Sequence, residues 1–236
     1  MDNFNTVLVD GMKKIDIQLT DEQIEKFNIY CELLIEWNNK MNLTAIKEPV
    51  DIAVKHFVDS CSVLKYVKIK NNAKVIDIGT GAGFPGIPLK IVRNDLKITL
   101  LDSLNKRLIF LNEVADKLDF DIETIHGRAE DFGRKDEYRE KYDIAISRAV
   151  APLNVLSEYC VPFVRNGGKF ISMKGPNVQS EIDESKKAIK VLGGKYNNVV
   201  QFNINDNSRS IVIVDKISQT PYTYPRHGSK ISKKPL

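Results

Sequence analysis

The chain has 236 residues, of which 42% are hydrophobic and 28% charged, and its formal net charge is +4. This length suits one α/β domain with a small extension. No apolar run reaches the roughly 18 residues that a membrane helix needs, and the first residues are too polar for a secretory leader. The cysteines, Cys31, Cys61 and Cys160, show no paired spacing, so we expect reduced thiols, no metal site and a cytoplasmic protein.

Residues 1–68 are expected to form a helical extension. Thr20-Asp21-Glu22-Gln23 is close to a capping box, in which side chains satisfy the free amides at a helix start. Apolar residues follow at helical spacing from Ile24 to Ile35, which predicts a helix that buries one face.

A second helix is expected from Glu48 to about Val67. His56, Asp59 and Ser60 lie three and four positions apart, so they share one face of this helix. Taken alone, three polar residues on one face are more typical of a solvated surface than of a functional site.

From Lys74 onward, strand and helix patterns alternate, which predicts parallel strands joined by right-handed crossovers. Strands are expected near 74–78, 97–102, 121–125, 142–147, 168–173, 198–204 and 209–215. Helices are expected over 86–93, 103–118, 152–164 and 178–192. Only a short polar turn separates the last two strands, so they should pair antiparallel. We therefore expect an α/β domain over residues 69–217 with a mostly parallel seven-stranded sheet that contains one antiparallel strand, the architecture typical of Rossmann-like methyltransferases.

The most informative run is Val75–Leu89, where an apolar strand leads through an acid and a glycine-rich turn into a helix start. Its glycines, Gly79, Gly81 and Gly83, allow positive φ angles and let a ligand lie against bare main chain. The following helix offers free amides at its first turn. This loop therefore predicts a site for a nucleotide-like cofactor.

Two cofactors fit this loop. Gly81–Gly86 matches the dinucleotide pattern G-x-G-x-x-G, whereas Asp77 with the alternating glycines matches S-adenosylmethionine (SAM) methyltransferases. Asp77 is placed to accept from the ammonium of a methionine group, or to order water there, and it would repel a pyrophosphate. These points favour SAM, with a dinucleotide or a plain strand–helix turn as alternatives.

Polar residues also follow the next two strands. Asp102 can accept from both ribose hydroxyls of an adenosine, or cap the helix that follows. Ala129 offers a backbone edge and Glu130 an acceptor for the adenine amino group, although a helix cap with salt bridges is an alternative. Because carboxyl ends of parallel strands share one sheet edge, these residues should surround one crevice.

Arg148 follows the fourth strand and cannot act as a base at neutral pH, so it would bind phosphate, carboxylate or a base edge. The Asn-Pro-Pro-aromatic run used for exocyclic amines is missing there, and Cys160 falls inside a predicted helix. A site with donors but no strong base suits an acceptor that has no proton to lose, such as guanine N7. Otherwise Arg148 pairs with a nearby acid.

The segment 218–236 forms a basic tail. From Lys216 to Leu236 there are five Lys or Arg residues and no acid, with Tyr222 and Tyr224 interleaved. Such a segment suits the phosphate backbone of a nucleic acid, but a solvated, disordered terminus is equally compatible with it.

Taken together, these segments resemble the RsmG (GidB) family of 16S rRNA guanine-N7 methyltransferases. The matching runs are Trp37 with Asn42–Ile46, His56–Ser60, Asp77–Ile87, Asp102-Ser103 with Lys106-Arg107, Gly127–Glu130, Ser147–Ala151, Lys174-Gly175 and Tyr224–Leu236. Two departures are Cys61, where a leucine is expected, and a tail one residue shorter than the family form after Arg226.

The resemblance implies methylation of N7 of a guanine in the 530 loop of 16S rRNA, in the bacterial cytoplasm. The implied SAM site contains Asp77, Gly79, Gly81, Gly83, Phe84, Asp102, Ser103, Leu104, Ala129, Glu130 and Arg148. The implied catalytic residues are His56, Asp59, Arg148 and Lys174. The implied RNA contacts are Lys174, Arg226, Lys230, Lys233 and Lys234.

We expect a monomer that needs no metal and acts on 16S rRNA or a small-subunit particle. Two alternatives remain open at this point. The first is an NAD(P)-dependent oxidoreductase, because of the glycine pattern; the second is a non-catalytic RNA-binding assembly factor, because of the basic tail.

Overall fold

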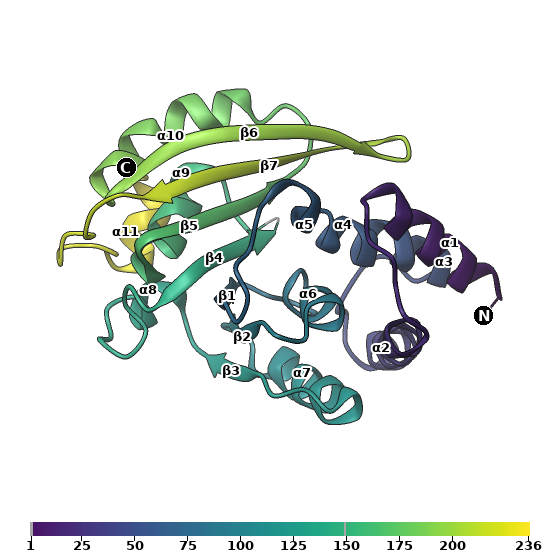
Figure 1. Ribbon diagram of the computed structural model, residues 1–236. Helices are drawn as coiled ribbons and strands as arrows, with labels where there is room; N and C mark the ends of the chain where they lie inside the picture. Colours follow the sequence, from purple (N-terminus) through teal and green to yellow (C-terminus); the bar gives the residue numbers. More distant parts are fainter. Residues whose placement is uncertain (1, 149) are drawn as a thin grey trace.

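A computed structural model describes residues 2–148 and 150–236, so Ala149, in the run after the fourth predicted strand, lies outside the described part. Seven strands form one sheet in the order β3-β2-β1-β4-β5-β7-β6 (Figure 1). They are β1 (Lys74–Ile78), β2 (Lys97–Asp102), β3 (Glu123–His126), β4 (Tyr142–Arg148), β5 (Val164–Lys174), β6 (Gly194–Ile204) and β7 (Asn207–Lys216). Strands β1 to β5 are parallel, and β7 runs antiparallel to β5 and β6. The predicted sheet with one antiparallel strand is confirmed.

Two strands begin four residues earlier than expected: β5 at Val164 rather than 168, and β6 at Gly194 rather than 198. Both starts contain glycines, which are depleted in strands and so hide a strand start in the sequence pattern.

Helices surround the sheet, and short helical turns join several of them (Figure 1). They are α1 (Asp2–Lys14), α2 (Asp21–Lys40), α3 (Pro49–Ile52), the π-helical turn η1 (Ala53–Val58), α4 (Asp59–Cys61), α5 (Val63–Tyr66), α6 (Gly86–Val92), α7 (Asn105–Leu118), α8 (Ala129–Phe132), α9 (Leu153–Cys160), the 3₁₀ turn η2 (Val161–Phe163), α10 (Gln179–Val191) and α11 (Gly228–Lys233). The helix expected over 48–67 is thus a series of short helical segments around a π turn. Of the described helices, none combines the length and apolar character needed to cross a membrane.

The predicted capping box at the start of α2 is present. The Thr20 hydroxyl accepts from the Gln23 amide at 3.2 Å, and the Gln23 side chain accepts from the Thr20 amide at 3.0 Å. The side-chain nitrogen of Gln23 also donates to the carbonyl of Ile91 in α6, at 3.1 Å. One residue therefore both begins α2 and ties it to the helix that follows the glycine loop.

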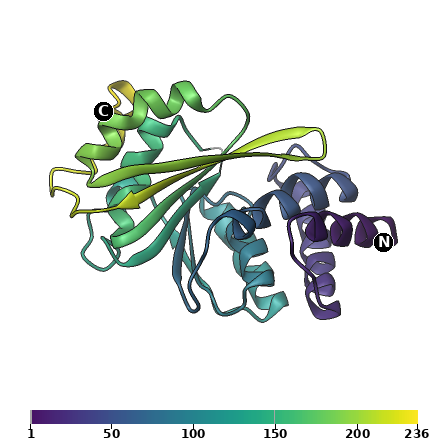
Figure 2. The ribbon, with the colours of Figure 1, turned by 45° about the horizontal axis from the view of Figure 1, so that its top comes forward.

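The sheet has a hydrophobic core on each face, because successive side chains of a strand point to opposite sides. Val75 of β1 belongs to the core shared by α1, α2, α6 and α7, whereas Ile76 belongs to the core under α9 and α10. Figure 2 shows these helices on their two sides of the sheet. The helical extension therefore adds to the layer that α6 and α7 form.

The basic tail packs against the domain rather than extending from it. The Arg139 guanidinium donates to the carbonyls of Thr220 at 2.6 Å and Tyr224 at 2.9 Å, and Ile231 of α11 is fully buried. The alternative of a disordered terminus is wrong for this segment, because Arg139 and an apolar contact hold it in place.

Candidate active site

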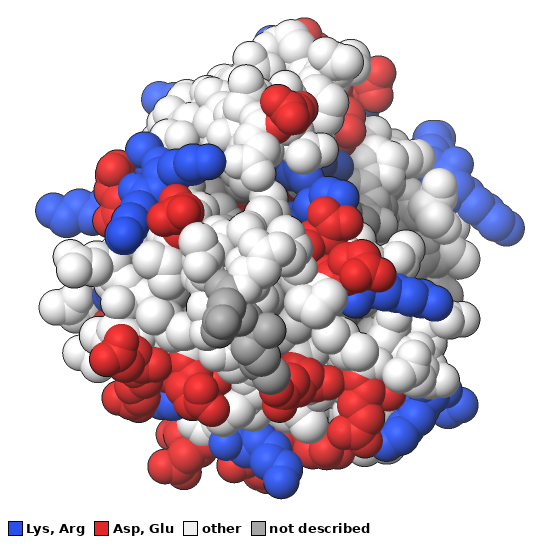
Figure 3. Space-filling model, turned by 90° about the vertical axis from the view of Figure 1, so that its right-hand side faces the viewer, with Lys and Arg blue, Asp and Glu red and all other residues white. Residues whose placement is uncertain are grey.

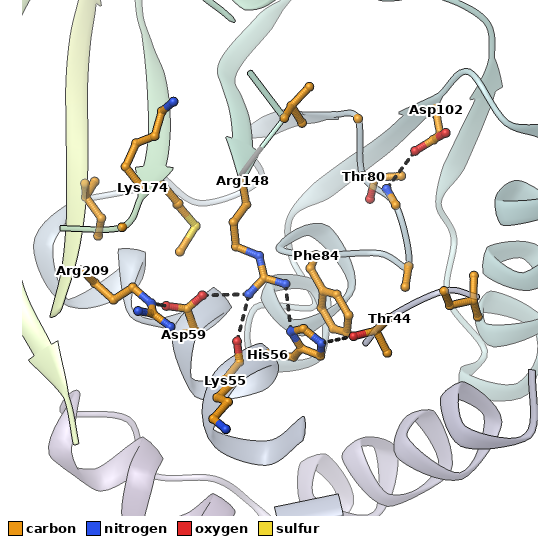
Figure 4. Close-up of a pocket in the computed structure, with 18 of the residues that line it drawn as sticks. Thr44, Lys55, His56, Asp59, Thr80, Phe84, Asp102, Arg148, Lys174 and Arg209 are labelled. Carbon is orange, nitrogen blue, oxygen red and sulfur yellow. Dashed lines mark hydrogen bonds and ion pairs between the residues drawn. The ribbon is translucent and has the colours of Figure 1, made fainter. Parts of the chain in front are cut away.

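A crevice of about 660 Å³ opens at the carboxyl edge of the sheet (Figure 4). It lies where the strand order reverses between β1 and β4, which is the place where open α/β sheets bind ligands. Nine of the expected site residues line it: His56, Asp59, Gly79, Gly81, Phe84, Asp102, Ser103, Arg148 and Lys174. Gly79, Asp102 and Arg148 therefore meet at one crevice as expected, whereas Ala129 and Glu130, expected there too, do not line it.

The glycine loop has the backbone that its sequence predicts. Gly79, Gly81 and Gly83 have φ angles of 68°, 61° and 97°. A β-carbon on Gly81 would meet nothing within 4 Å, whereas one on Gly83 would lie 2.7 Å from the hydroxyl of Tyr30. Gly81 therefore presents bare main chain to the crevice, and Gly83 allows the loop to pack closely against α2.

Asp77 lies beneath this loop and is fully buried. Its Oδ2 atom accepts from the Thr80 hydroxyl at 2.7 Å and from the Gly86 amide at 2.9 Å, while its Oδ1 atom has no partner among the described residues. Burial raises the pKa of this carboxyl group to about 6, against the two hydrogen bonds that lower it. Asp77 thus shapes the loop and keeps one acceptor atom free.

Asp102 joins the glycine loop to the end of β2. Its carboxylate accepts from the Gly81 amide and from the Leu104 amide, each at 2.9 Å, and Arg107 lies 3.2 Å away. The N-cap of α7 is Leu104 and it carries no side-chain cap bond, so Asp102 orders the turn before the helix rather than capping it. The Asp102 side chain lines the crevice, where a ribose could reach it.

The opposite end of the crevice is an ion cluster centred on Asp59 (Figure 4). Arg148 donates to one oxygen of the Asp59 carboxylate at 2.7 Å, and Arg209 donates to the other at 2.8 Å. Arg148 also donates to the carbonyl of Lys55 at 3.2 Å and lies over the ring of Phe84. One buried carboxylate thus holds two guanidinium groups in place.

His56 belongs to the same cluster. Its Nδ1 atom lies 3.2 Å from the Arg148 guanidinium, its Nε2 atom lies 2.7 Å from the Thr44 hydroxyl, and its ring stacks on Phe84. Because arginine only donates, Nδ1 must accept, which places the proton on Nε2. Burial and the Arg148 charge lower the pKa of His56 to about 3. His56 is therefore neutral at neutral pH, with its lone pair already in use.

The prediction of a solvated polar face for this helix is wrong. His56 and Asp59 point into the crevice, and Ser60 is fully buried with no partner for its hydroxyl among the described residues. The reason is that η1 and α4 cover the sheet edge, so the shared face meets β4 and β7 instead of water.

Other expected residues lie away from the crevice wall. These are Asp77, Gly83, Leu104, Ala129, Glu130, Arg226, Lys230, Lys233 and Lys234. Leu104 is half exposed, whereas Ala129 and Glu130 are buried in α8. Lys174 does line the crevice, but its ammonium group donates to the Ala151 carbonyl at 2.6 Å and to Glu181 at 2.7 Å.

The sequence analysis missed several lining residues: Thr44, Lys55, Thr80, Arg107, Phe202 and Arg209. Arg209 could have been found from topology. Because β7 runs antiparallel, its beginning lies beside the carboxyl ends of the parallel strands, and Arg209 is near that beginning.

The model of one protein family, described as rRNA small subunit methyltransferase G, matches residues 23–212. The chain belongs to this family. It is 53% identical over 233 residues to the ribosomal RNA small subunit methyltransferase G of Acetivibrio thermocellus, with 98% of this chain and 96% of the relative covered. It is 52% identical to the protein of the same name from Desulforamulus reducens, with both chains covered completely. The resemblance expected from the sequence motifs is confirmed.

Solved structures show the same fold as this rRNA small subunit methyltransferase G family member. One is M. jannaschii TYW2 in complex with AdoMet, with a TM-score of 0.51, 15% identity, and 63% of this chain and 71% of that chain covered. Another is Aeropyrum pernix fibrillarin with natively bound SAM, with a TM-score of 0.50, 15% identity, and 63% and 68% covered. These likenesses support the methyltransferase fold.

Family and fold together identify a SAM-dependent methyltransferase, so the dinucleotide alternative is wrong. The described residues fit this cofactor. Gly81 leaves open space above bare main chain, and the free Oδ1 atom of Asp77 is an acceptor of the kind that an ammonium group needs. Asp102 stands at the end of β2, where a ribose is held in such folds.

Proposed function

We propose that this enzyme methylates N7 of a guanine in the 530 loop of 16S rRNA, in the bacterial cytoplasm. The relatives named ribosomal RNA small subunit methyltransferase G support the RNA substrate. The observation that carries the choice of acceptor atom is the chemistry of the cluster around Asp59, which contains donors and a neutral histidine but no available base.

At the cofactor end, the glycine loop and Asp102 would hold SAM, with Asp77 beneath them. When bound, this cofactor supplies a methyl group on a positively charged sulfur. The loop's main chain would fix the direction from which that methyl group is approached. Correct positioning alone is worth roughly 7–11 kcal/mol in favourable cases.

At the acceptor end, the cluster around Asp59 would hold the guanine. N7 has a lone pair and no proton, so transfer needs no proton acceptor there. His56 could not serve as one, because Arg148 occupies its Nδ1 lone pair. The Arg148 guanidinium is a donor that could bind the O6 edge of guanine, and the Asp59 carboxylate lies beside it to balance the charge that the purine gains.

The charge of the crevice wall supports RNA binding. Its described lining includes five Lys or Arg residues, Lys55, Arg107, Arg148, Lys174 and Arg209, against two acids, Asp59 and Asp102. On the face shown in Figure 3, by contrast, acidic side chains gather along the lower edge and basic ones are scattered. A polyanion would therefore approach the crevice, and the exposed Lys230, Lys233 and Lys234 of the tail would add phosphate contacts.

The deciding experiment uses small-subunit particles from a strain that lacks this gene. The enzyme and SAM should restore N7-methylguanine in the 530 loop, detected by reductive strand cleavage. A synthetic RNA in which the target guanine carries carbon in place of N7 is the matched control, and it should accept no methyl group. Methylation of that control, or of another base atom, would contradict the proposed acceptor. Tight RNA binding with no transfer to either substrate would favour the non-catalytic assembly factor.

A further inference from the structure

The tail is fixed to the domain by a buried ion pair. The backbone amide of Arg226 donates to Oε1 of Glu158 at 2.7 Å, and its guanidinium donates to Oε2 of the same carboxylate, also at 2.7 Å. Glu158 lies in α9 and is fully buried. The ion pair therefore fixes the position of Arg226, and with it the backbone path of the two residues that follow.

This backbone path places Gly228 against the side chain of Glu130. A β-carbon added to Gly228 would lie 1.9 Å from Oε1 of Glu130 and 2.9 Å from its carboxyl carbon. Any larger residue would therefore have to push the Glu130 side chain aside. Glu130 is only 6% exposed, so little free space surrounds it.

Glu130 does not line the crevice, but its segment is joined to the adenosine end. Glu130 lies in α8, shortly after β3, and β3 pairs with β2 so that His126 is opposite Asp102. The Gly127 amide donates to the Asp102 carbonyl at 3.1 Å, which joins the segment after β3 to the residue expected to hold the ribose. A displacement of Glu130 would therefore also displace the segment next to the expected position of the adenine ring.

We infer that the tail is part of the cofactor site: Gly228 is a positioning residue that lets the tail hold Glu130, and with it the segment 127–130, at the adenine end of the crevice. This inference rests on the proposed use of SAM. In this arrangement the part of the tail that contacts Glu130 supports the cofactor site, whereas the lysines of α11 are exposed to solvent.

The test is Gly228→Ala, with Ser229→Ala in the same short helix as the matched control. Calorimetry measures the affinity for S-adenosylhomocysteine and for S-inosylhomocysteine, which lacks the adenine amino group. For Gly228→Ala we expect the affinity for S-adenosylhomocysteine to fall about 10-fold. The ratio of the affinities for S-adenosylhomocysteine and S-inosylhomocysteine should become smaller, and the affinity for RNA should not change. A loss of stability alone would weaken both compounds equally and leave the preference as it was.

A second variant keeps the test decisive. Glu130→Ala removes the side chain that Gly228→Ala would displace, so the effects of the two substitutions should not add. An unchanged adenine preference in Gly228→Ala, or a loss of RNA affinity instead, would overturn the inference. Failure of the wild-type enzyme to bind S-adenosylhomocysteine would count against the proposed function itself.

Discussion

The two ends of the crevice are built in different ways. The cofactor end consists of main chain from one short segment, supported by Asp77 and Asp102. The acceptor end consists of side chains from distant segments, with Asp59 joining Arg148 and Arg209. Under the proposed function, the first end would recognise its ligand through shape and backbone amides, whereas the second would do so through charge. Substitutions at the two ends should therefore affect different steps.

The largest effect is expected for Arg148→Ala. This change removes a guanidinium that contacts Asp59, His56 and the Lys55 carbonyl, and it leaves a buried carboxylate with one partner. Because the proposed function gives Arg148 the contact to the guanine, we expect kcat/KM for small-subunit particles to fall at least about 100-fold. Breaking the buried ion pair would separately lower the stability of the fold by about 3–5 kcal/mol. Methyl transfer from radiolabelled SAM measures the loss of kcat/KM.

Arg165→Ala is the matched control, because Arg165 is also ion-paired, with Asp143 at 2.6 Å, but is half exposed and outside the crevice. Its activity should equal that of the wild type. For Arg148→Ala, the affinity for SAM should change by less than about threefold. A loss of SAM affinity as large as the loss of kcat/KM would show that Arg148 acts in cofactor binding rather than at the acceptor end.

Gly81→Ala should produce the next largest effect, at the cofactor end. Its φ of 61° strains a residue with a side chain by about 1 kcal/mol, and the new methyl group would project into the crevice. We expect affinity for SAM to fall about 10-fold, measured by calorimetry. Gly175→Ala is the control, because Gly175 also lines the crevice with open space around it but has no positive φ. Equal effects of the two substitutions would contradict a specific role for the loop.

Asp77→Asn should have the smallest effect, and it has a pH signature. Burial raises the pKa of Asp77 from 3.8 to about 6, so between these values the folded protein holds a proton that the unfolded chain releases. Stability is therefore lost as the pH rises through this window. Without ligand, Asp77→Asn should melt about 2–4 °C above the wild type at pH 7, and the difference should vanish near pH 4.

The same substitution should weaken SAM binding about threefold at pH 7, because the ammonium group loses a negative partner. Wild-type affinity should fall as the pH drops through 6, whereas that of Asp77→Asn should not. Calorimetry and thermal melts across this range separate the two contributions. If the wild-type melting temperature rose from pH 4 to pH 7 relative to that of the variant, the raised pKa would be refuted.

The cofactor end could be predicted from the sequence because it is local. The glycine loop, Asp77 and the strand before them form one continuous run, and backbone geometry follows from glycine spacing. The sheet topology was also predictable, because strand–helix alternation forces parallel pairing and a short turn forces the reversal. The largest errors were at the two strand starts that contain glycine, each misplaced by four residues.

The acceptor end could not be predicted fully because it depends on long-range packing. Asp59 and Arg209 are 150 positions apart, and no local pattern connects them. The low pKa of His56 likewise comes from Arg148 and from burial, neither of which helix periodicity describes. The order of the tail could not be predicted for a related reason, since it depends on the buried carboxylate of Glu158.

The reversed strand β7 also has a consequence for synthesis. Since Arg209 arrives on the last strand of the sheet, an unfinished chain on the ribosome already carries the glycine loop, Asp77, Asp102 and Arg148, but Asp59 still lacks its second cation. Such a nascent chain lacks both this cation and the tail, so neither its acceptor end nor the contact between Gly228 and Glu130 is complete. Competence to modify RNA would arrive abruptly, near the end of translation.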